Sequence, residues 1–266
     1  MLIQGSFRWQ TMIPDLAVLL PFALVVFVAV YFHTVTGFGL AMIIMGLSAG
    51  AGFLSVAALA NVVSVVTLLN SVVALRGNMH HLPRRETLTM TIAVLPASVL
   101  GVILLNFMSV EAAGVIQVLL GALIVYGGVS LAWRPKPLEQ ISSQAGFFYY
   151  GFLGGLVGGM FGIPGPPLIF HLYRQPMPLE RIRSILIFLN AAIAGARTIY
   201  VVAERQLYTQ ELVLSVVCLP LVAIATMVGK RCPPPFSAET MRRIAFVFLV
   251  LMGGTLAAPV LLQWSL

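Results

Sequence analysis

The residue whose type and position most directly suggest chemistry is Arg197, an arginine inside an otherwise apolar run over 181–203. A charge within a membrane-spanning helix is costly, so it is retained mainly where it binds a substrate, an ion or a partner group. A guanidinium binds anions, and we predict that Arg197 faces the substrate. The alternative is a structural pair with Glu204, which lies two helical turns further along the same helix face.

Two glycine-rich breaks in apolar runs indicate a second means of binding an anion. They are Thr36-Gly37-Phe38-Gly39 and Phe161-Gly162-Ile163-Pro164-Gly165, the latter followed by Pro166-Pro167. A break leaves unpaired N–H groups and a partial positive charge at the start of the following helix. Close packing of helices is the alternative reason for glycine at such positions. We predict that both breaks line the substrate site, through Gly37, Phe38, Gly39, Gly162, Pro164, Gly165 and Pro166.

Four polar side chains near these breaks are further candidates. Asn70 and Asn190 occupy matching places in the two halves of the chain. Each is predicted either to hydrogen-bond an oxyanion or to cross-link neighbouring helices. His33 and His171 adjoin the breaks, and imidazoles titrate near neutral pH, so both are candidates for coupling protons to transport. The alternative for each histidine is a passive group near a helix end.

The acidic residues and the motifs exclude several classes of function. Cation carriers and proton relays commonly keep a carboxylate within the bilayer. Here every acidic residue lies near the end of an apolar run: Asp15, Glu86, Glu111, Glu139, Glu180, Glu204, Glu211 and Glu239. No Ser/His/Asp arrangement, H-E-x-x-H motif, paired carboxylates or P-loop occurs, so neither an enzyme nor a self-contained ATPase is predicted. Cys218 and Cys232 lack metal or disulfide spacing, and no metal or cofactor is expected.

The composition places these residues in a membrane. Sixty per cent of the residues are hydrophobic, 9% are charged and the mean hydropathy is +1.02, whereas a soluble domain carries roughly 25% charged residues. Apolar runs long enough to cross about 30 Å of hydrocarbon recur throughout. We predict an all-α integral membrane protein, a polytopic bundle of about 8–10 hydrophobic segments forming one membrane domain over 1–266. The ten candidate segments are 14–33, 37–54, 56–75, 88–107, 112–133, 146–161, 163–173, 181–203, 211–229 and 240–263.

The two halves of the chain resemble each other. Each has a glycine break, then a helix with an internal asparagine, then a helix with an interior proline (Pro96 and Pro220). Each ends with Ser-x-Glu before an apolar run that holds a Gly-Gly pair, at Gly127-Gly128 and at Gly253-Gly254. Four similarities in one order indicate an internal repeat. We predict a first repeat over 12–133, a short cytoplasmic linker over 134–144 and a second repeat over 145–266.

The basic residues predict the orientation of these repeats. When crossings alternate strictly, 12 of the 15 Lys and Arg fall in loops on one side, near 76–85, 134–136, 174–183 and 230–243. The positive-inside rule makes that side cytoplasmic, and the net charge of +7 then reflects topology and not a nucleic-acid partner. Each half crosses an odd number of times, so the halves insert in opposite senses. The prediction is two inverted-topology repeats with broken or re-entrant helices near the midplane, the architecture of many secondary transporters.

The motif Gly-Met-Phe-Gly-Ile-Pro-Gly-Pro-Pro-Leu-Ile (159–169), with the weaker Thr-Gly-Phe-Gly-Leu-Ala (36–41), resembles the TauE/SafE family of sulfite-exporter-like membrane permeases. The resemblance implies two related halves and transport of small sulfur-containing anions across a bacterial inner membrane. Some family glycines are replaced, by Leu40 and Ala41 in the first half and by Pro164 and Pro166 in the second. The architecture therefore carries over better than the substrate.

Together these observations predict a secondary transporter (permease) of a small anion that works by alternating access. The class implied by the resemblance is a sulfur-containing oxyanion or an organosulfonate. The alternative is a non-transporting membrane scaffold or accessory subunit. The predicted partners are the anion and the lipid bilayer. The sequence does not determine the oligomeric state, and a homodimer is compatible with it.

Overall fold

The computed structural model describes residues 16–50, 54–76, 82–109, 113–132, 138–163, 166–206 and 209–232, together with six helical positions between 247 and 257. The continuous ranges hold nine helices and no strand. They are α1 (Leu16–Thr36), α2 (Leu40–Gly50), α3 (Val56–Leu75), α4 (Arg84–Ser109), α5 (Ala113–Ala132), α6 (Gln144–Phe161), α7 (Pro166–Tyr173), α8 (Leu179–Ala203) and α9 (Thr209–Arg231). The all-α prediction is confirmed, and each helix matches one of the first nine predicted segments. The tenth, 240–263, lies almost entirely outside the described residues.

Five of these helices are long and apolar enough to cross a membrane. They are the stretches Leu19–Thr36, Val56–Leu75, Arg84–Met108, Leu179–Ala203 and Gln210–Arg231. Their outer faces carry large apolar side chains such as Phe107 and Ile199, which are 85% and 72% exposed. Contiguous apolar surface of this kind is unfavourable in water and suits lipid. By contrast α2 and α7 have 11 and 8 residues, which is about 17 and 12 Å of helix and too short to span.

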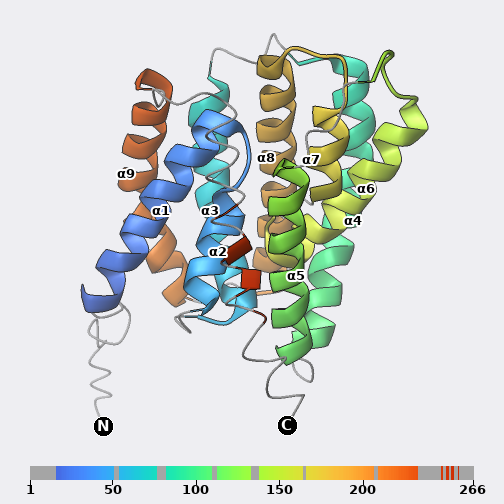
Figure 1. Ribbon diagram of the computed structural model, residues 1–266. Helices are drawn as coiled ribbons and strands as arrows, with labels where there is room; N and C mark the ends of the chain where they lie inside the picture. The colour runs from blue at the N-terminus through green and yellow to red at the C-terminus, as the bar shows by residue number, and fades with distance from the viewer. Residues whose placement is uncertain are drawn as a thin grey trace, which may run out of the picture.

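The bundle is organised around α3 and α8, which pack together at its centre (Figure 1). Helices α1 and α9 lie on one side of this pair, and α4 and α6 lie on the other. Helices α3 and α8 are antiparallel, because Asn61 near the start of α3 contacts Arg197 near the end of α8, while Ala74 near the end of α3 packs on Ile187.

The outer pairs are parallel. Helices α1 and α9 run in the same direction as α3, since Asn70 of α3 bonds both Thr34 of α1 and Thr226 of α9, each late in its own helix. Helices α4 and α6 also run together, because Thr89 bonds Gln144 near their starts. Each of the two outer pairs, α1–α9 and α6–α4, thus joins a helix of the first half of the chain to one of the second half.

Small residues let α4 and α6 approach closely. Gly151, Gly155 and Gly159 recur every fourth residue on the face of α6 that meets α4. A Cβ atom at Gly155 would lie 2.7 Å from the carbonyl oxygen of Val94, and one at Gly159 would lie 1.9 Å from that of Ser98. No side chain fits at the second distance. Helices in lipid gain little from hydrophobic burial against one another, so such backbone contact supplies the van der Waals energy that holds them together.

Nearly all basic residues of the described part of the chain lie at one end of the bundle, here called the basic end. The ends of α3 and α9 meet there, and the Lys230 ammonium donates to the carbonyls of Val73 at 2.9 Å and Arg76 at 3.3 Å. Among the described residues only Arg197 and Arg205 lie elsewhere. The basic end carries Arg76, Arg84, Arg85, Arg174, Arg181, Arg183, Lys230 and Arg231. This is the charge pattern that the positive-inside rule associates with the cytoplasmic side.

The contact between α4 and α6 leads to a stability prediction. Gly159→Ala places a methyl group where the Ser98 carbonyl oxygen lies and forces the two helices apart. We expect the free energy of unfolding to fall by about 3 kcal/mol, at or above the usual cost of overpacking. Gly254→Ala is the control, because a Cβ atom at Gly254 meets no atom of the described residues within 4 Å. Thermal unfolding of the purified proteins in detergent measures the difference. Equal midpoints for the two variants would contradict the close packing.

Candidate functional site

The first helix break lies between α1 and α2. Gly37 and Gly39 have φ angles of 86° and 95°, in the left-handed region that glycine adopts without strain. Phe38 between them is buried and packs edge-on against Phe32 of α1 and Tyr173 of α7, with ring centroids 5.8 and 6.1 Å away. The predicted trio Gly37, Phe38 and Gly39 thus forms a turn inside the protein, with its one side chain acting as an apolar anchor.

The end of α1 at this break is held by residues from the second half of the chain. The Arg183 guanidinium of α8 donates to the carbonyl of Thr34. The Tyr173 hydroxyl, at the end of α7, donates to the carbonyl of Thr36 at 3.4 Å. The last carbonyls of a helix lack intrahelical partners. These two side chains therefore take the place of the hydrogen bonds that α1 loses where it stops.

The second break follows α6 and has a corresponding arginine. Gly162 ends α6 in a left-handed conformation with φ 68°, and its N–H donates to the Gly158 carbonyl at 2.8 Å. The Arg197 guanidinium of α8 donates to the carbonyls of Gly159 and, at 3.4 Å, Met160. Both broken helices therefore end on an arginine of α8. The predicted site residues Pro164 and Gly165 lie outside the described residues.

Arg197 belongs to a buried network. It is 1% exposed, and its guanidinium donates to the Asn61 side-chain carbonyl of α3 at 3.0 Å. The Asn61 amide in turn donates to the Glu211 carboxylate at 2.8 Å. Glu204, the partner considered from the sequence, is exposed. The carboxylate near Arg197 is instead Glu211, whose burial its place at the end of an apolar run did not reveal.

Arg183, Asn190 and Arg197 recur every seventh residue of α8 and so share one face of that helix. At about 1.5 Å per residue, neighbours along this face are about 10 Å apart and the two arginines about 21 Å apart. Each arginine binds carbonyls at one break, so the ends of α1 and α6 are held at different levels of α8. Arg183 was read from the sequence only as a topological charge. Its seven-residue spacing from Asn190 was the signal that could have identified it.

The two predicted asparagines have different environments. The Asn70 amide is buried and donates to the hydroxyls of Thr34 at 3.0 Å and Thr226 at 2.9 Å. That arrangement is the helix cross-link considered from the sequence. Asn190 is 3% exposed, and its amide nitrogen has no hydrogen-bond partner among the described residues. An unpaired buried donor is costly, and it is the group that an oxyanion would satisfy.

Two further unpaired hydroxyls lie level with Asn190. They belong to Thr67 and Ser71 of α3, both buried and without a hydrogen-bond partner among the described residues. Because α3 and α8 are antiparallel, with the contacts Asn61–Arg197 and Ala74–Ile187 on either side, these hydroxyls and Asn190 occupy the same depth. Sequence reasoning missed Thr67 and Ser71, since hydroxyls in an apolar helix usually bond its own carbonyls.

The helices that follow the two breaks, α2 and α7, each have a residue of their first turn close to Gly127 of α5. A Cβ atom on Gly127 of α5 would lie 3.1 Å from the Met42 methyl group of α2 and 3.3 Å from Pro166 of α7. The first intrahelical bond of α2 runs from Ile43 to Gly39 at 2.9 Å, so the preceding N–H groups have no acceptor within the helix. The start of α7 has fewer donors, because Pro166 and its neighbour Pro167 lack N–H groups. The start of α2 thus offers more N–H groups without an acceptor in the helix than the start of α7 does.

The predicted proton-coupling residues lie at different places. His33 is buried one turn before the first break, close to the backbone of Phe38 and within electrostatic range of Arg183. Neither ring nitrogen of His33 has a hydrogen-bond partner among the described residues. His171 lies instead at the far end of α7, away from the break that precedes that helix. Coupling of protons by either residue stays a prediction.

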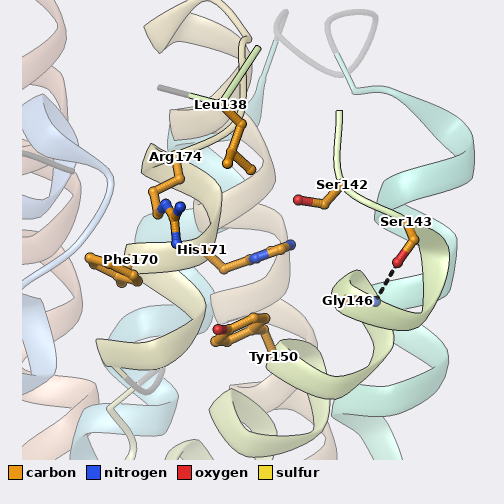
Figure 2. Close-up of a pocket in the computed structure, with 8 residues that line it drawn as sticks. All are labelled: Leu138, Ser142, Ser143, Gly146, Tyr150, Phe170, His171 and Arg174. Atoms are coloured by element: carbon orange, nitrogen blue, oxygen red, sulfur yellow. Dashed lines mark hydrogen bonds between the residues drawn. The ribbon is translucent and has the colours of Figure 1, made fainter. Parts of the chain in front are cut away.

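A cavity of about 250 Å³ lies at the basic end, where the start of α6 faces the end of α7 (Figure 2). His171 is stacked on Tyr150 with ring centroids 4.4 Å apart, and Arg174 lies over the Phe170 ring at 5.5 Å. Burial, and then the charge of Arg174, lowers the pKa of His171 to about 4, so the imidazole is neutral at physiological pH. The full lining is Leu138, Ser142, Ser143, Gly146, Tyr150, Phe170, His171 and Arg174.

Comparison with known proteins decides the family. The family described as Sulfite exporter TauE/SafE matches residues 22–256, which include both breaks, all of α8 and the cavity. The chain belongs to this family. A relative from Cupriavidus necator, described as "Probable sulfite/organosulfonate exporter TauE", is 47% identical over 236 residues, covering 89% of this chain and 92% of the relative. No solved structure matches the chain.

The match to TauE/SafE confirms the family resemblance read from the two motifs. With the five apolar helices it establishes a multi-pass membrane protein and a transporter. Both the family and the relative are exporters, which agrees with the prediction that the chain is not an enzyme. In a transporter, buried donors without partners are candidates for contact with the cargo.

The network around Arg197 leads to a second prediction. Arg197→Met removes the cation that binds the Gly159 carbonyl and Asn61, and takes a positive charge away from the neighbourhood of the Glu211 carboxylate. Breaking a buried charge pair in this way costs about 3–5 kcal/mol. We expect the double variant Arg197→Met/Glu211→Gln to recover part of the loss. Chemical unfolding in detergent measures all three proteins, with the exposed Arg205→Gln as control. A single variant as stable as the unmodified protein would rule out the network.

Proposed function

We propose that the chain exports sulfite or a small organosulfonate as a secondary carrier, by alternating access across a bacterial inner membrane. The name of the Cupriavidus necator relative supports the substrate class. The observation that carries the proposal is the α8 face with Arg183, Asn190 and Arg197, which reaches from one helix break to the other. These groups are cations and a hydrogen-bond donor, as an oxyanion requires.

The chemistry follows from competition for the arginine N–H groups. A guanidinium presents donors in a planar fork, and it binds an oxyanion more strongly than a neutral carbonyl. In the state described, Arg183 and Arg197 bind carbonyls at the ends of the broken helices. An anion that reaches either arginine would displace those carbonyls and release the break. The unpaired amide of Asn190, with the hydroxyls of Thr67 and Ser71, offers an intermediate position.

Alternating access would use two gates related by an inverted repeat. We propose that 12–133 and 145–266 are these repeats, joined by the linker 134–144, with α2 and α7 re-entrant. The antiparallel packing of α3 and α8 supports this repeat. The outer pairs support it too, because an exchange of the two halves of the chain would place α1–α9 on α6–α4.

The contacts of the two breaks add to that support. A Cβ atom on Gly37 would meet Arg183, and one on Gly162 would meet Val63. Val63 lies seven residues before Asn70, and Arg183 lies seven residues before Asn190, so the two positions correspond in the two halves. The two breaks therefore make corresponding contacts with opposite halves, as an axis between α3 and α8 requires.

The cavity between α6 and α7 lies at the basic end, which we take to be cytoplasmic from the positive-inside rule. Towards the other end the network of Asn61, Arg197 and Glu211 joins α3, α8 and α9, and Arg197 also binds the end of α6. We infer an inward-facing state in which this network is the closed outer gate. A non-transporting scaffold would have no use for unpaired donors at the bundle centre.

Transport by reconstituted protein tests the proposal. Proteoliposomes loaded with labelled sulfite or ethanesulfonate should release both, and Asn190→Leu should lower the rate at least tenfold, because the middle of the path loses its donor. Ile199→Ala, on the lipid-facing side of the same helix, is the matched control and should retain the rate. If the unmodified protein moves no anion, the function is refuted. If Asn190→Leu transports normally, the path along α8 is refuted.

A pH gradient tests the coupling role proposed for the histidines. If His33 or His171 carries protons, release should accelerate with an imposed gradient, and His33→Gln or His171→Gln should abolish that acceleration. An identical gradient response in both variants would show that neither imidazole couples protons.

A further inference from the structure

We propose that the cavity between α6 and α7 is a second anion site, at the basic end, which receives an organosulfonate before it reaches the face of α8. This inference rests on the proposed function and makes its substrate class more specific. The cavity residues belong to α6, α7 and the adjoining segments, and none of them contributes to the Arg183–Asn190–Arg197 face.

The charge in this cavity comes from Arg174. Its guanidinium lies over the Phe170 ring, and no carboxylate of the described residues forms an ion pair with it. A cation–π contact partly compensates a desolvated cation but leaves its in-plane N–H groups free for an acceptor. Arg174 thus has its charge available to an anion, whereas Arg183 and Arg197 are bound to carbonyls.

A built set of hydrogen bonds orients the polar wall opposite Arg174. Gln175 is buried, and its side-chain carbonyl accepts the Ser142 N–H at 3.0 Å while its amide donates to the Ser142 hydroxyl oxygen at 3.0 Å. The Ser142 oxygen is therefore used as an acceptor, and its own hydrogen is left for a ligand. The neighbouring Ser143 begins α6 by accepting from Gly146 at 3.3 Å, which places the positive end of that helix at the same wall.

The buried His171 contributes a neutral ring. Its Nε2 lies 3.4 Å from the Gln175 amide nitrogen. The two hydrogens of that amide have closer acceptors in the Ser142 hydroxyl oxygen and the His171 carbonyl, at 3.0 Å each, so Gln175 joins the start of α6 to the end of α7 beside the ring. In Figure 2 the ring extends from α7 into the cavity, above Tyr150 and towards Ser142. It adds polarity without a second positive charge.

The size of the cavity selects among the sulfur anions. Its volume of about 250 Å³ equals roughly eight water molecules at about 30 Å³ each. Sulfite is much smaller than this space. A sulfonate head group at Arg174 and Ser142 leaves room for a short alkyl tail against Tyr150, Phe170 and Leu138, which form the apolar part of the wall. The site therefore suits an organosulfonate better than sulfite.

Binding in this cavity can affect the centre of the bundle through α7. Helix α7 has eight residues. It begins at Pro166, which lies close to Gly127 of α5, and ends at Tyr173, which lies beside the first break. Arg174 follows directly. A ligand that draws Arg174 inward would pull on α7, the short helix that follows the second break and ends beside the first. Binding in the cavity would thereby be coupled to the proposed gates.

The test compares ethanesulfonate with sulfite in the reconstituted full chain. Arg174→Gln should raise the KM for ethanesulfonate at least tenfold while the maximal rate changes less than twofold, and Arg174→Lys should recover part of the affinity. Arg181→Gln, an exposed arginine at the same end, is the matched control and should leave KM unchanged. Tyr150→Leu should weaken ethanesulfonate more than sulfite, because only the former has a tail.

Equilibrium binding of labelled ethanesulfonate to detergent-purified protein separates this inference from the proposed function. If the unmodified protein transports but Arg174→Gln keeps its KM, the cavity assignment fails and the function stands. If nothing is transported, binding that Arg174→Gln abolishes still supports the cavity, whereas equal or absent binding refutes it. Measurements in phosphatidylcholine with and without phosphatidylglycerol complete the test. An effect of Arg174→Gln that appears only with phosphatidylglycerol would mean that the site holds a lipid phosphate, which overturns the assignment.

Discussion

The structure depends on how two helices can stop inside a membrane protein. A helix that ends at membrane depth leaves carbonyl groups without partners, and lipid cannot satisfy them. Here Arg183 and Arg197 of α8 each donate to carbonyls of a broken helix, at Thr34 and at Gly159. The charge that makes an arginine costly in lipid is offset by these bonds. The same two interactions make α8 the element against which both breaks are positioned.

The rest of the bundle supports this arrangement by close packing. Glycines of α6 bring its backbone against α4, and α5 makes a second close contact, where a Cβ atom on Gly253 would lie 2.6 Å from the carbonyl oxygen of Gly121. Rigid pairs of this kind can move as units. In contrast, the ends of the two broken helices are held by hydrogen bonds from long side chains, which exchange more easily than a packed interface. The division between rigid pairs and exchangeable contacts is what a gated carrier requires.

Polar groups along the centre are unequally satisfied, and the difference is informative. The Asn70 amide donates to two threonines. Its counterpart Asn190, at the depth of Thr67 and Ser71, has an amide nitrogen without a partner among the described residues, and so do the hydroxyls of those two residues. A protein usually pairs its buried polar atoms, so several unpaired donors at one depth suggest a place for an acceptor that comes and goes. The cavity at the basic end repeats this pattern with Arg174 and Ser142.

The sequence alone determined the helical class, nine of the segments and the TauE/SafE family. The length of an apolar run and the position of a glycine break are local properties of the sequence, and the thickness of the bilayer sets the length that a spanning helix needs. It also singled out Arg197, since a charge within an apolar run is conspicuous wherever it points. Only the tertiary structure decided what Arg197 binds, that Glu211 is buried near it and that Arg183 has the same role at the other break. Those facts depend on which helices face one another. A hydropathy pattern gives the depth of a residue but not its neighbours across the bundle.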